Sequence, residues 1–242
     1  MNTSTNKNQT PPKIPGHLLF EPMPEEASPA LVIESLLKYP GRIIHELQNN
    51  WRVTLPVCLS LLVLLGMAAY GLVVGSFSGG AQVWIAPTKI VIGTLLSILI
   101  CLPSLYIFIS LGGVEARLRT VIGVFLAAVG LGTLILIGFA PVAWIFSQST
   151  DSIAFIAGLH IGLWIIGILF GLRLLRAMSS FLGGAARSHL KTWSVIFVLV
   201  CLQMMTTLRP IVGKSEHFLS GEKKFFLAHW LETVSATSQK RK

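Results

Sequence analysis

Polar side chains that could do chemistry are rare inside the apolar stretches of this 242-residue sequence. His160 lies in GLHIGLWIIGILFG, and Gln203 lies in QMMTT, next to Thr206 and Thr207. A polar residue in hydrocarbon is costly unless it is hydrogen-bonded, and such residues often mark ion or solute sites. His160 could carry a proton or a ligand, or it could be a neutral side chain bonded to a neighbouring helix, with Gln203 as a candidate partner. No Asp or Glu occurs in an apolar run to complete a proton relay, which favours the structural interpretation.

The motifs of membrane-embedded enzymes are incomplete. SFSG at Ser76–Gly79 lacks the leading glycine of rhomboid proteases, and HELQN at His45 lacks the second histidine of HExxH metalloproteases. CAAX-type proteases need a Glu-Glu pair inside a span, whereas Glu25-Glu26 lies in a polar stretch. No Walker or dinucleotide-binding glycine pattern occurs. We therefore expect no enzyme, no catalytic residue, no cofactor and no metal site. The three cysteines lie in apolar runs and are predicted to be buried apolar residues: Cys58, Cys101 and Cys201.

The composition indicates a membrane protein. Hydrophobic residues make up 53% of the chain and charged residues 12%, about half the charge of a typical soluble domain. Because a charge near the bilayer centre costs several kcal/mol, the intervals between charges define the spans. With Lys89 as a boundary, they predict an all-α, multi-pass transmembrane helical bundle of five spans. The spans are expected at about 53–76, 90–111, 121–146, 153–172 and 193–208, and the last is the shortest.

The distribution of basic residues predicts the orientation of the bundle. Five spans place the two termini on opposite sides of the membrane. The segments on the N-terminal side carry more Lys and Arg, once the last three cations, far from the membrane, are discounted. The positive-inside rule then puts the N-terminus in the cytoplasm and the C-terminus outside. The expected location is the cell membrane, of bacterial inner-membrane type.

Two flanking segments carry their own signals. Residues 1–28 are polar and rich in Asn, Thr and Pro, which predicts a disordered tail. Residues 29–52 show apolar residues at helical spacing on both sides of Pro40-Gly41. This pattern predicts two short amphipathic helices lying in the inner membrane interface. The alternative is that they extend the bundle into the cytoplasm.

Residues 209–242 form the C-terminal tail. Pro210 disfavours helical geometry at Arg209, so the fifth span is expected to end there, with the guanidinium near a lipid phosphate. An amphipathic helix is predicted at about 221–234, with Trp230 in its apolar stripe and Lys223 and Lys224 flanking it. That helix lies either on the membrane surface or across the outer mouth of the bundle.

Small residues in the fourth span predict close helix packing. Gly158 and Gly162 form one small-xxx-small pair, and Gly167 and Gly171 form another. Elsewhere, Pro103 in the second span and Pro141 late in the third would each kink or end a helix.

Two segments, PTKIVIGTLLSILICLPSLYIFISLGG and LRPIVGKSEHF, resemble an uncharacterised family of bacterial inner-membrane proteins with a Leu-Arg-Pro tail motif. The order of elements over residues 29–213 is also similar to the Yip-type superfamily, with an amphipathic approach and five clustered spans. The Asp-Leu-Tyr-Gly-Pro-type motif of its eukaryotic members is missing here, so binding of prenylated small GTPases does not carry over. The resemblance implies a non-enzymatic membrane protein that organises or recruits partners.

The leading hypothesis is thus a membrane-organising or scaffold component. Its expected partners are anionic lipid headgroups and a membrane protein or a second copy of the chain. The net charge of +9 is attributed to topology and headgroups, and nucleic acid is not expected. The alternative is a transporter or channel subunit for a small solute or ion that uses His160, Gln203 and the break at Pro103.

Overall fold

The computed structural model describes residues 22–23, 28–50, 52–113, 117–181 and 187–207, and all regular secondary structure in these ranges is α-helical. The tail residues Arg209, Pro210, Lys223, Lys224 and Trp230 lie outside these ranges, as does most of the polar N-terminal segment. The helices are α1 (Pro29–Lys38), α2 (Pro40–Asn49), α3 (Thr54–Ser76), α4 (Gln82–Leu111), α5 (Leu118–Ser149), α6 (Ile153–Phe181) and α7 (Arg187–Thr207).

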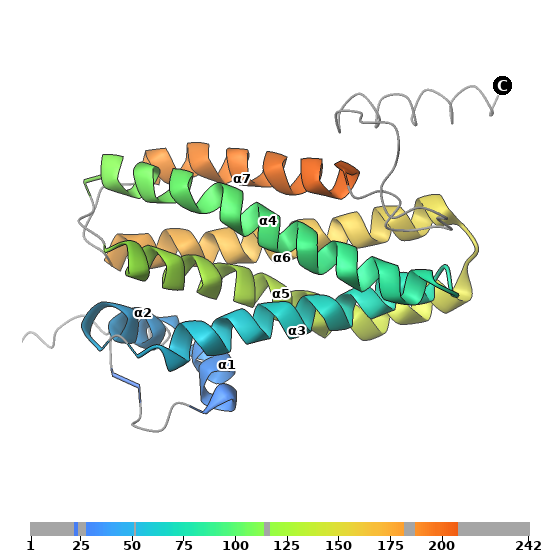
Figure 1. Ribbon diagram of the computed structural model, residues 1–242, viewed down its shortest axis with the longest axis horizontal. Helices are drawn as coiled ribbons and strands as arrows, with labels where there is room; N and C mark the ends of the chain where they lie inside the picture. The colour runs from blue at the N-terminus through green and yellow to red at the C-terminus, as the bar shows by residue number, and fades with distance from the viewer. Residues whose placement is uncertain (1–21, 24–27, 51, 114–116, 182–186, 208–242) are drawn as a thin grey trace, which may run out of the picture.

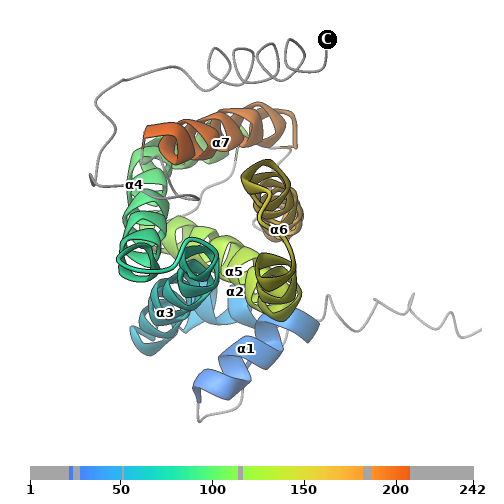
Figure 2. The same ribbon diagram turned by 90° about the vertical axis from the view of Figure 1, so that its right-hand side faces the viewer.

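Five helices form an up-and-down bundle. Helices α3 to α7 run alongside one another, each reversing the direction of the one before, and α1 and α2 lie near one end (Figure 1). Figure 2 looks along the helices: α4, α7, α6 and α5 follow one another around the bundle, and α3 fills the corner between α4 and α5. The most extensive contacts join α5 to α6, and α3 to both α4 and α5.

Four of these helices, α3 to α6, are long and apolar enough to cross a membrane. The apolar part of helix α7 is shorter than those of the other four and covers only His189–Met204. The second and fourth predicted spans differ most from the helices of the structure. Helix α4 begins at Gln82 instead of about 90, so Lys89 lies in its second turn, and α6 continues to Phe181 instead of ending at about 172. Helix α4 also continues through Pro87 and Pro103, and α5 continues through Pro141.

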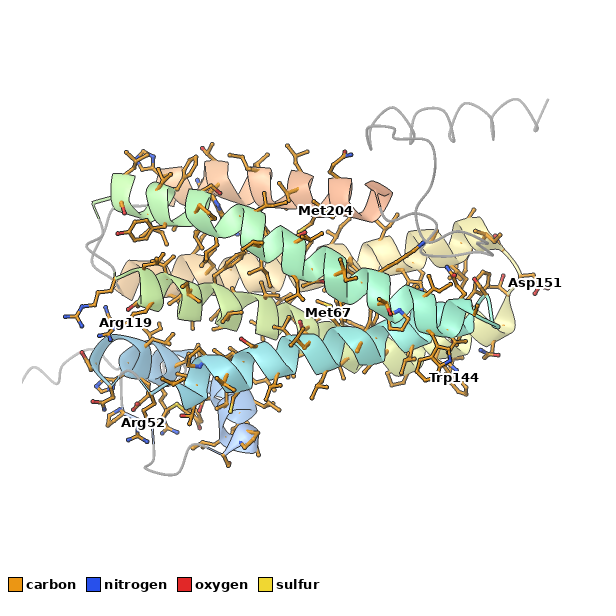
Figure 3. All side chains as sticks on the ribbon, in the orientation of Figure 1. Arg52, Met67, Arg119, Trp144, Asp151 and Met204 are labelled. Atoms are coloured by element: carbon orange, nitrogen blue, oxygen red, sulfur yellow. The ribbon has the colours of Figure 1, made fainter. Side chains whose placement is uncertain are left out.

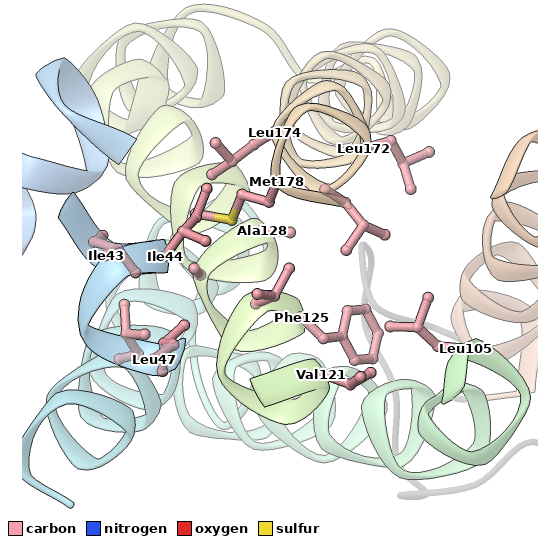
Figure 4. Close-up of a cluster of buried hydrophobic side chains, with 14 of the residues drawn as sticks. Ile43, Ile44, Leu47, Leu105, Val121, Phe125, Ala128, Leu172, Leu174 and Met178 are labelled. Carbon is pink, nitrogen blue, oxygen red and sulfur yellow. The ribbon is translucent and has the colours of Figure 1, made fainter. Parts of the chain in front are cut away.

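The predicted break in the N-terminal segment is present. Ser28 caps α1 by accepting a hydrogen bond from the Leu31 N–H, and Pro40 starts α2 because proline cannot continue the preceding helix. Helix α2 turns its apolar face toward α5 and α6, where Ile43, Ile44 and Leu47 lie in the main hydrophobic cluster (Figure 4).

Packing on the bundle thus occupies the apolar face of α2. The Thr120 hydroxyl of α5 donates a hydrogen bond to the Leu47 carbonyl at 3.2 Å. On α1, Val32 and Leu36 are buried against the bundle, whereas Leu37 is 56% exposed. These contacts are compatible with both predicted locations of α1 and α2, in the inner membrane interface or as an extension of the bundle into the cytoplasm.

Close backbone approaches fix the relative heights of the long helices. Gly71 of α3 lies against Pro87 of α4, with no space for a side chain. Between α5 and α6, Gly132 meets Gly167, and a Cβ atom on Gly171 would come within 2.5 Å of the Ala128 carbonyl oxygen. Two of the predicted packing glycines, Gly167 and Gly171, therefore lie at a tight helix contact. The other two, Gly158 and Gly162, have open space at the Cβ position.

Helix α7 is anchored to α4 beside a proline. The indole N–H of Trp193 donates to the Ser104 hydroxyl at 3.0 Å, one residue after Pro103. Ser104 in turn donates to the Cys101 carbonyl at 2.9 Å. Hydroxyl side chains commonly satisfy backbone groups near prolines in membrane helices. Trp193 also stacks on Phe197, with 5.3 Å between ring centroids.

Replacing Gly171 with Ala should destabilise the bundle, because the new methyl group would collide with the α5 backbone. Overpacking of this kind costs about 1–3 kcal/mol. The thermal unfolding midpoint in detergent measures the effect. Gly158→Ala, on the same helix but facing open space, is the matched control and should be neutral or slightly stabilising. Equal loss of stability in both variants would contradict the packing described.

Candidate functional site: a polar layer inside the bundle

The candidate site begins with a buried tyrosine–histidine pair. The Tyr70 hydroxyl of α3 and Nδ1 of His160 in α6 are 2.8 Å apart and share a hydrogen bond. Their rings meet edge to face, with centroids 5.6 Å apart. His160 is only 4% exposed, so it faces the bundle. Its partner is Tyr70, not the expected Gln203.

The second ring nitrogen of His160 sets this pair apart. Nε2 is buried and has no hydrogen-bond partner among the described residues. In a neutral imidazole, one nitrogen donates and the other accepts, so either tautomer leaves a hydrogen-bonding group of Nε2 unused. Leaving such a buried group unsatisfied costs about 1–3 kcal/mol. A water molecule or a bound solute would remove that cost.

Lys89 lies at the same height in the bundle. It is fully buried, at 0% exposure. Tyr70 precedes Gly71 by one residue, and Lys89 follows Pro87 by two, on helices that run in opposite directions. Because Gly71 and Pro87 are in contact and a helix rises 1.5 Å per residue, the two residues lie within about 2 Å along the bundle axis. Tyr70, Lys89 and His160 thus form one layer, which we call the polar layer.

The polar layer lies inside the region that a membrane would cover. Lys89 is seven residues from the start of α4 and His160 seven from the start of α6, a depth of about 10 Å. Trp84, which is 73% exposed, and Trp144, which is 51% exposed, lie near this end of the bundle. Trp144 is labelled there in Figure 3. Exposed tryptophans are typical of the membrane–water interface, so the layer lies on the hydrocarbon side of that belt.

Other buried hydroxyl groups in the spans are satisfied within their own helices. Thr94 donates to the Ile90 carbonyl at 2.8 Å, and Ser97 donates to the Gly93 carbonyl at 2.8 Å. Ser147 does the same with Ala143. This is the ordinary structural role of small hydroxyl side chains in a helix. It distinguishes them from His160, whose Nε2 has no such bond.

Sequence reasoning found one member of the layer and missed two. The sequence predicts Lys89 at the end of a span because an isolated charge is expensive in lipid. The mostly apolar residues before it, AQVWIAP, are the sign that the helix starts earlier. Tyr70 carried no signal of its own within its apolar run. Gln203, the other predicted polar residue, is partly buried in α7 and forms interactions of its own.

No model of a known protein family matches the chain, and no curated protein or solved structure matches it. In the described ranges, no group of three or more His, Cys, Asp or Glu side chains is placed to hold a metal ion. In the tautomer with its proton on Nε2, His160 can donate a hydrogen bond to a bound acceptor, while the Tyr70 hydroxyl donates to Nδ1. The Lys89 amine belongs to the same layer.

Proposed function

We propose that this multi-pass membrane protein binds a small anion within the bilayer, at the polar layer, as part of a transport path. The observation that carries the proposal is the complete burial of Lys89 in a membrane-spanning helix. This develops the transporter or channel alternative drawn from His160, with its partner Tyr70 and with Lys89 at the same height in place of Gln203.

The burial of Lys89 calls for a functional explanation. A lysine near the end of a membrane helix usually extends its amine to the headgroups. Lys89 does not reach any exposed surface. Polar and ionisable residues inside a membrane are expensive, and by default they mark substrate or ion pathways.

The surroundings of Lys89 favour an anion as the bound species. Electrostatic attraction is much stronger in a low-dielectric interior than in water. The four long apolar helices contain no Asp or Glu in their sequence. A small anion in the layer would be attracted by the lysine and could accept a hydrogen bond from Nε2 of His160.

The test is anion efflux from proteoliposomes. Vesicles are loaded with potassium chloride, sulfate or phosphate, a potassium ionophore balances the charge, and the released anion is measured. We expect release of at least one anion to exceed that from protein-free vesicles. Lys89→Met and His160→Ala should each slow that release about tenfold or more, the effect of losing about 1.4 kcal/mol of stabilisation.

Lys38→Met is the matched control, because Lys38 is an exposed lysine at the surface of α1. It should release the anion at the wild-type rate. All variants must be inserted and must unfold at similar temperatures. Release at the wild-type rate from both Lys89→Met and His160→Ala, or no release of any of the three anions, would contradict the proposal.

A second candidate function, the membrane-organising or scaffold role, is supported by a different observation. All described Lys and Arg side chains except Lys89 lie at the end of the bundle that carries α1 and α2, which we call the basic end; Figure 3 labels Arg52 and Arg119 there and Asp151 at the opposite end. A dense group of cations beside a membrane attracts anionic lipid headgroups. The described cations of the basic end are Lys38, Arg42, Arg52, Arg117, Arg119, Arg173, Arg176 and Lys191.

The concentration of Lys and Arg at one end of the bundle also supports an orientation of the protein in the membrane. If α7 crosses the membrane with the four longer helices, the chain has five spans and its termini lie on opposite sides. The positive-inside rule then places the basic end in the cytoplasm. This arrangement is the one expected for the Yip-like architecture and for a cell-membrane protein of bacterial type, both of which stay predictions.

Thiol labelling tests this orientation. In a variant lacking the three native cysteines, a cysteine at Ser78, in the α3–α4 loop, should react with a membrane-impermeant reagent in intact cells. A cysteine at Asn49, at the exposed end of α2, should react only after lysis. Both sites are polar positions outside the apolar spans, and labelling of both cysteines after lysis is the control for their reactivity. The reverse labelling pattern would show that the basic end faces outward.

A further inference from the structure

We infer that a groove between α1 and α3 holds one acyl chain of a membrane phospholipid. The inference deepens the membrane-organising candidate and rests on it, because it gives the lipid a defined seat next to the basic end. The groove has a volume of about 340 Å³. Val32 and Ile33 of α1 form one wall, and Cys58, Leu62 and Gly66 of α3 form its floor.

The groove lies where hydrocarbon is the surrounding medium. On α3 it extends from Cys58 to Ala69, about 16 Å along a helix that is long and apolar enough to cross the membrane. Its lining is apolar side chains and small residues, and Ile137 of α5 closes one side. Leu65, at the edge of the groove, is 68% exposed and faces the same medium. An apolar occupant is therefore required.

The dimensions of the groove suit a slim occupant. Its volume of about 340 Å³ extends over about 16 Å of α3, so the groove is long and narrow. The acyl chains of the surrounding phospholipids have this shape. A single unbranched hydrocarbon chain is slim enough to lie along this length.

The basic end accounts for the direction in which the lipid lies. Arg52 precedes Cys58 by six residues, about 9 Å along the chain toward the basic end. A chain lying in the groove therefore has its headgroup at the height of Arg52 and its methyl end near Ala69. Phosphate groups are attracted to cations at this height. The acyl-chain contact and the headgroup attraction are separate interactions, and they can be tested separately.

Photo-crosslinking tests the inference on the full chain. The protein is reconstituted in vesicles of phosphatidylcholine and phosphatidylglycerol, with a trace of phosphatidylglycerol that carries a diazirine on its acyl chain. Crosslinked residues are mapped by mass spectrometry. We expect crosslinks to be concentrated on the α3 segment from Cys58 to Ala69 and on the start of α1. Ala69→Phe, which fills one end of the groove, should cause a several-fold loss of these crosslinks.

Leu72→Phe is the matched control, since it adds the same ring to an exposed position of α3 outside the groove. It should leave the crosslinks in place. Ile33→Phe fills the groove from the opposite wall and repeats the test if Ala69→Phe does not fold. Crosslinks spread evenly over the exposed apolar surface, or unchanged in the filled variants, would overturn the inference.

The choice of headgroup separates the inference from the proposed function. If a diazirine-bearing phosphatidylcholine labels the groove as strongly as phosphatidylglycerol does, the acyl-chain seat is supported and recruitment of anionic lipid fails. If phosphatidylglycerol binds the protein more strongly than phosphatidylcholine but labels no groove residue, the anionic preference stands and the acyl-chain seat is overturned.

Discussion

Hydrocarbon offers no hydrogen-bond partner, and the construction of this bundle depends on that constraint. Each polar group in a span has to be satisfied by the protein itself. Thr94 and Ser97 bond to carbonyls of their own helix. The indole N–H of Trp193 in α7 donates a hydrogen bond to the Ser104 hydroxyl, beside Pro103 of α4. These bonds let α4 remain helical through Pro103 and keep α7 against it. A single rule thus accounts for both the local structure and the packing.

His160 departs from this rule at one ring nitrogen, and for that reason the polar layer around it is the best candidate for a functional site. Tyr70 and His160 satisfy one another at one nitrogen only. Lys89 lies at the same height and is completely buried. The Gly71–Pro87 contact brings α3 and α4 close together at the height of this layer. Tight packing therefore serves the site as well as the stability of the bundle. The basic end lies at the opposite end of the bundle, and the groove between α1 and α3 extends from near it along α3 as far as Ala69, next to Tyr70.

The sequence predicted the helical class, the four long apolar helices and the break at Pro40, because each follows from a strong local signal. Long apolar runs require helices in lipid, and proline ends the helix before it. It did not predict the polar layer, since that depends on which helices lie side by side and at what height. Lys89 shows the difficulty: locally it resembles the end of a span, and only the Gly71–Pro87 contact places it inside. Of the four glycines that looked equivalent, Gly171 meets a backbone while Gly158 meets none.

The central claim is that Lys89 lies within the hydrocarbon of the membrane, and the depth of its neighbour Thr88 measures this most directly. Thr88 is exposed on α4, so a spin label attached to a cysteine there faces the surroundings of the bundle. In reconstituted vesicles, power-saturation electron paramagnetic resonance compares its accessibility to oxygen and to a water-soluble nickel complex. The account predicts a label open to oxygen and shielded from nickel, unlike a label at Ala81, about 10 Å nearer the end of the bundle. A label at Thr88 as accessible to nickel as one at Ala81 would place Lys89 outside the hydrocarbon and contradict the account.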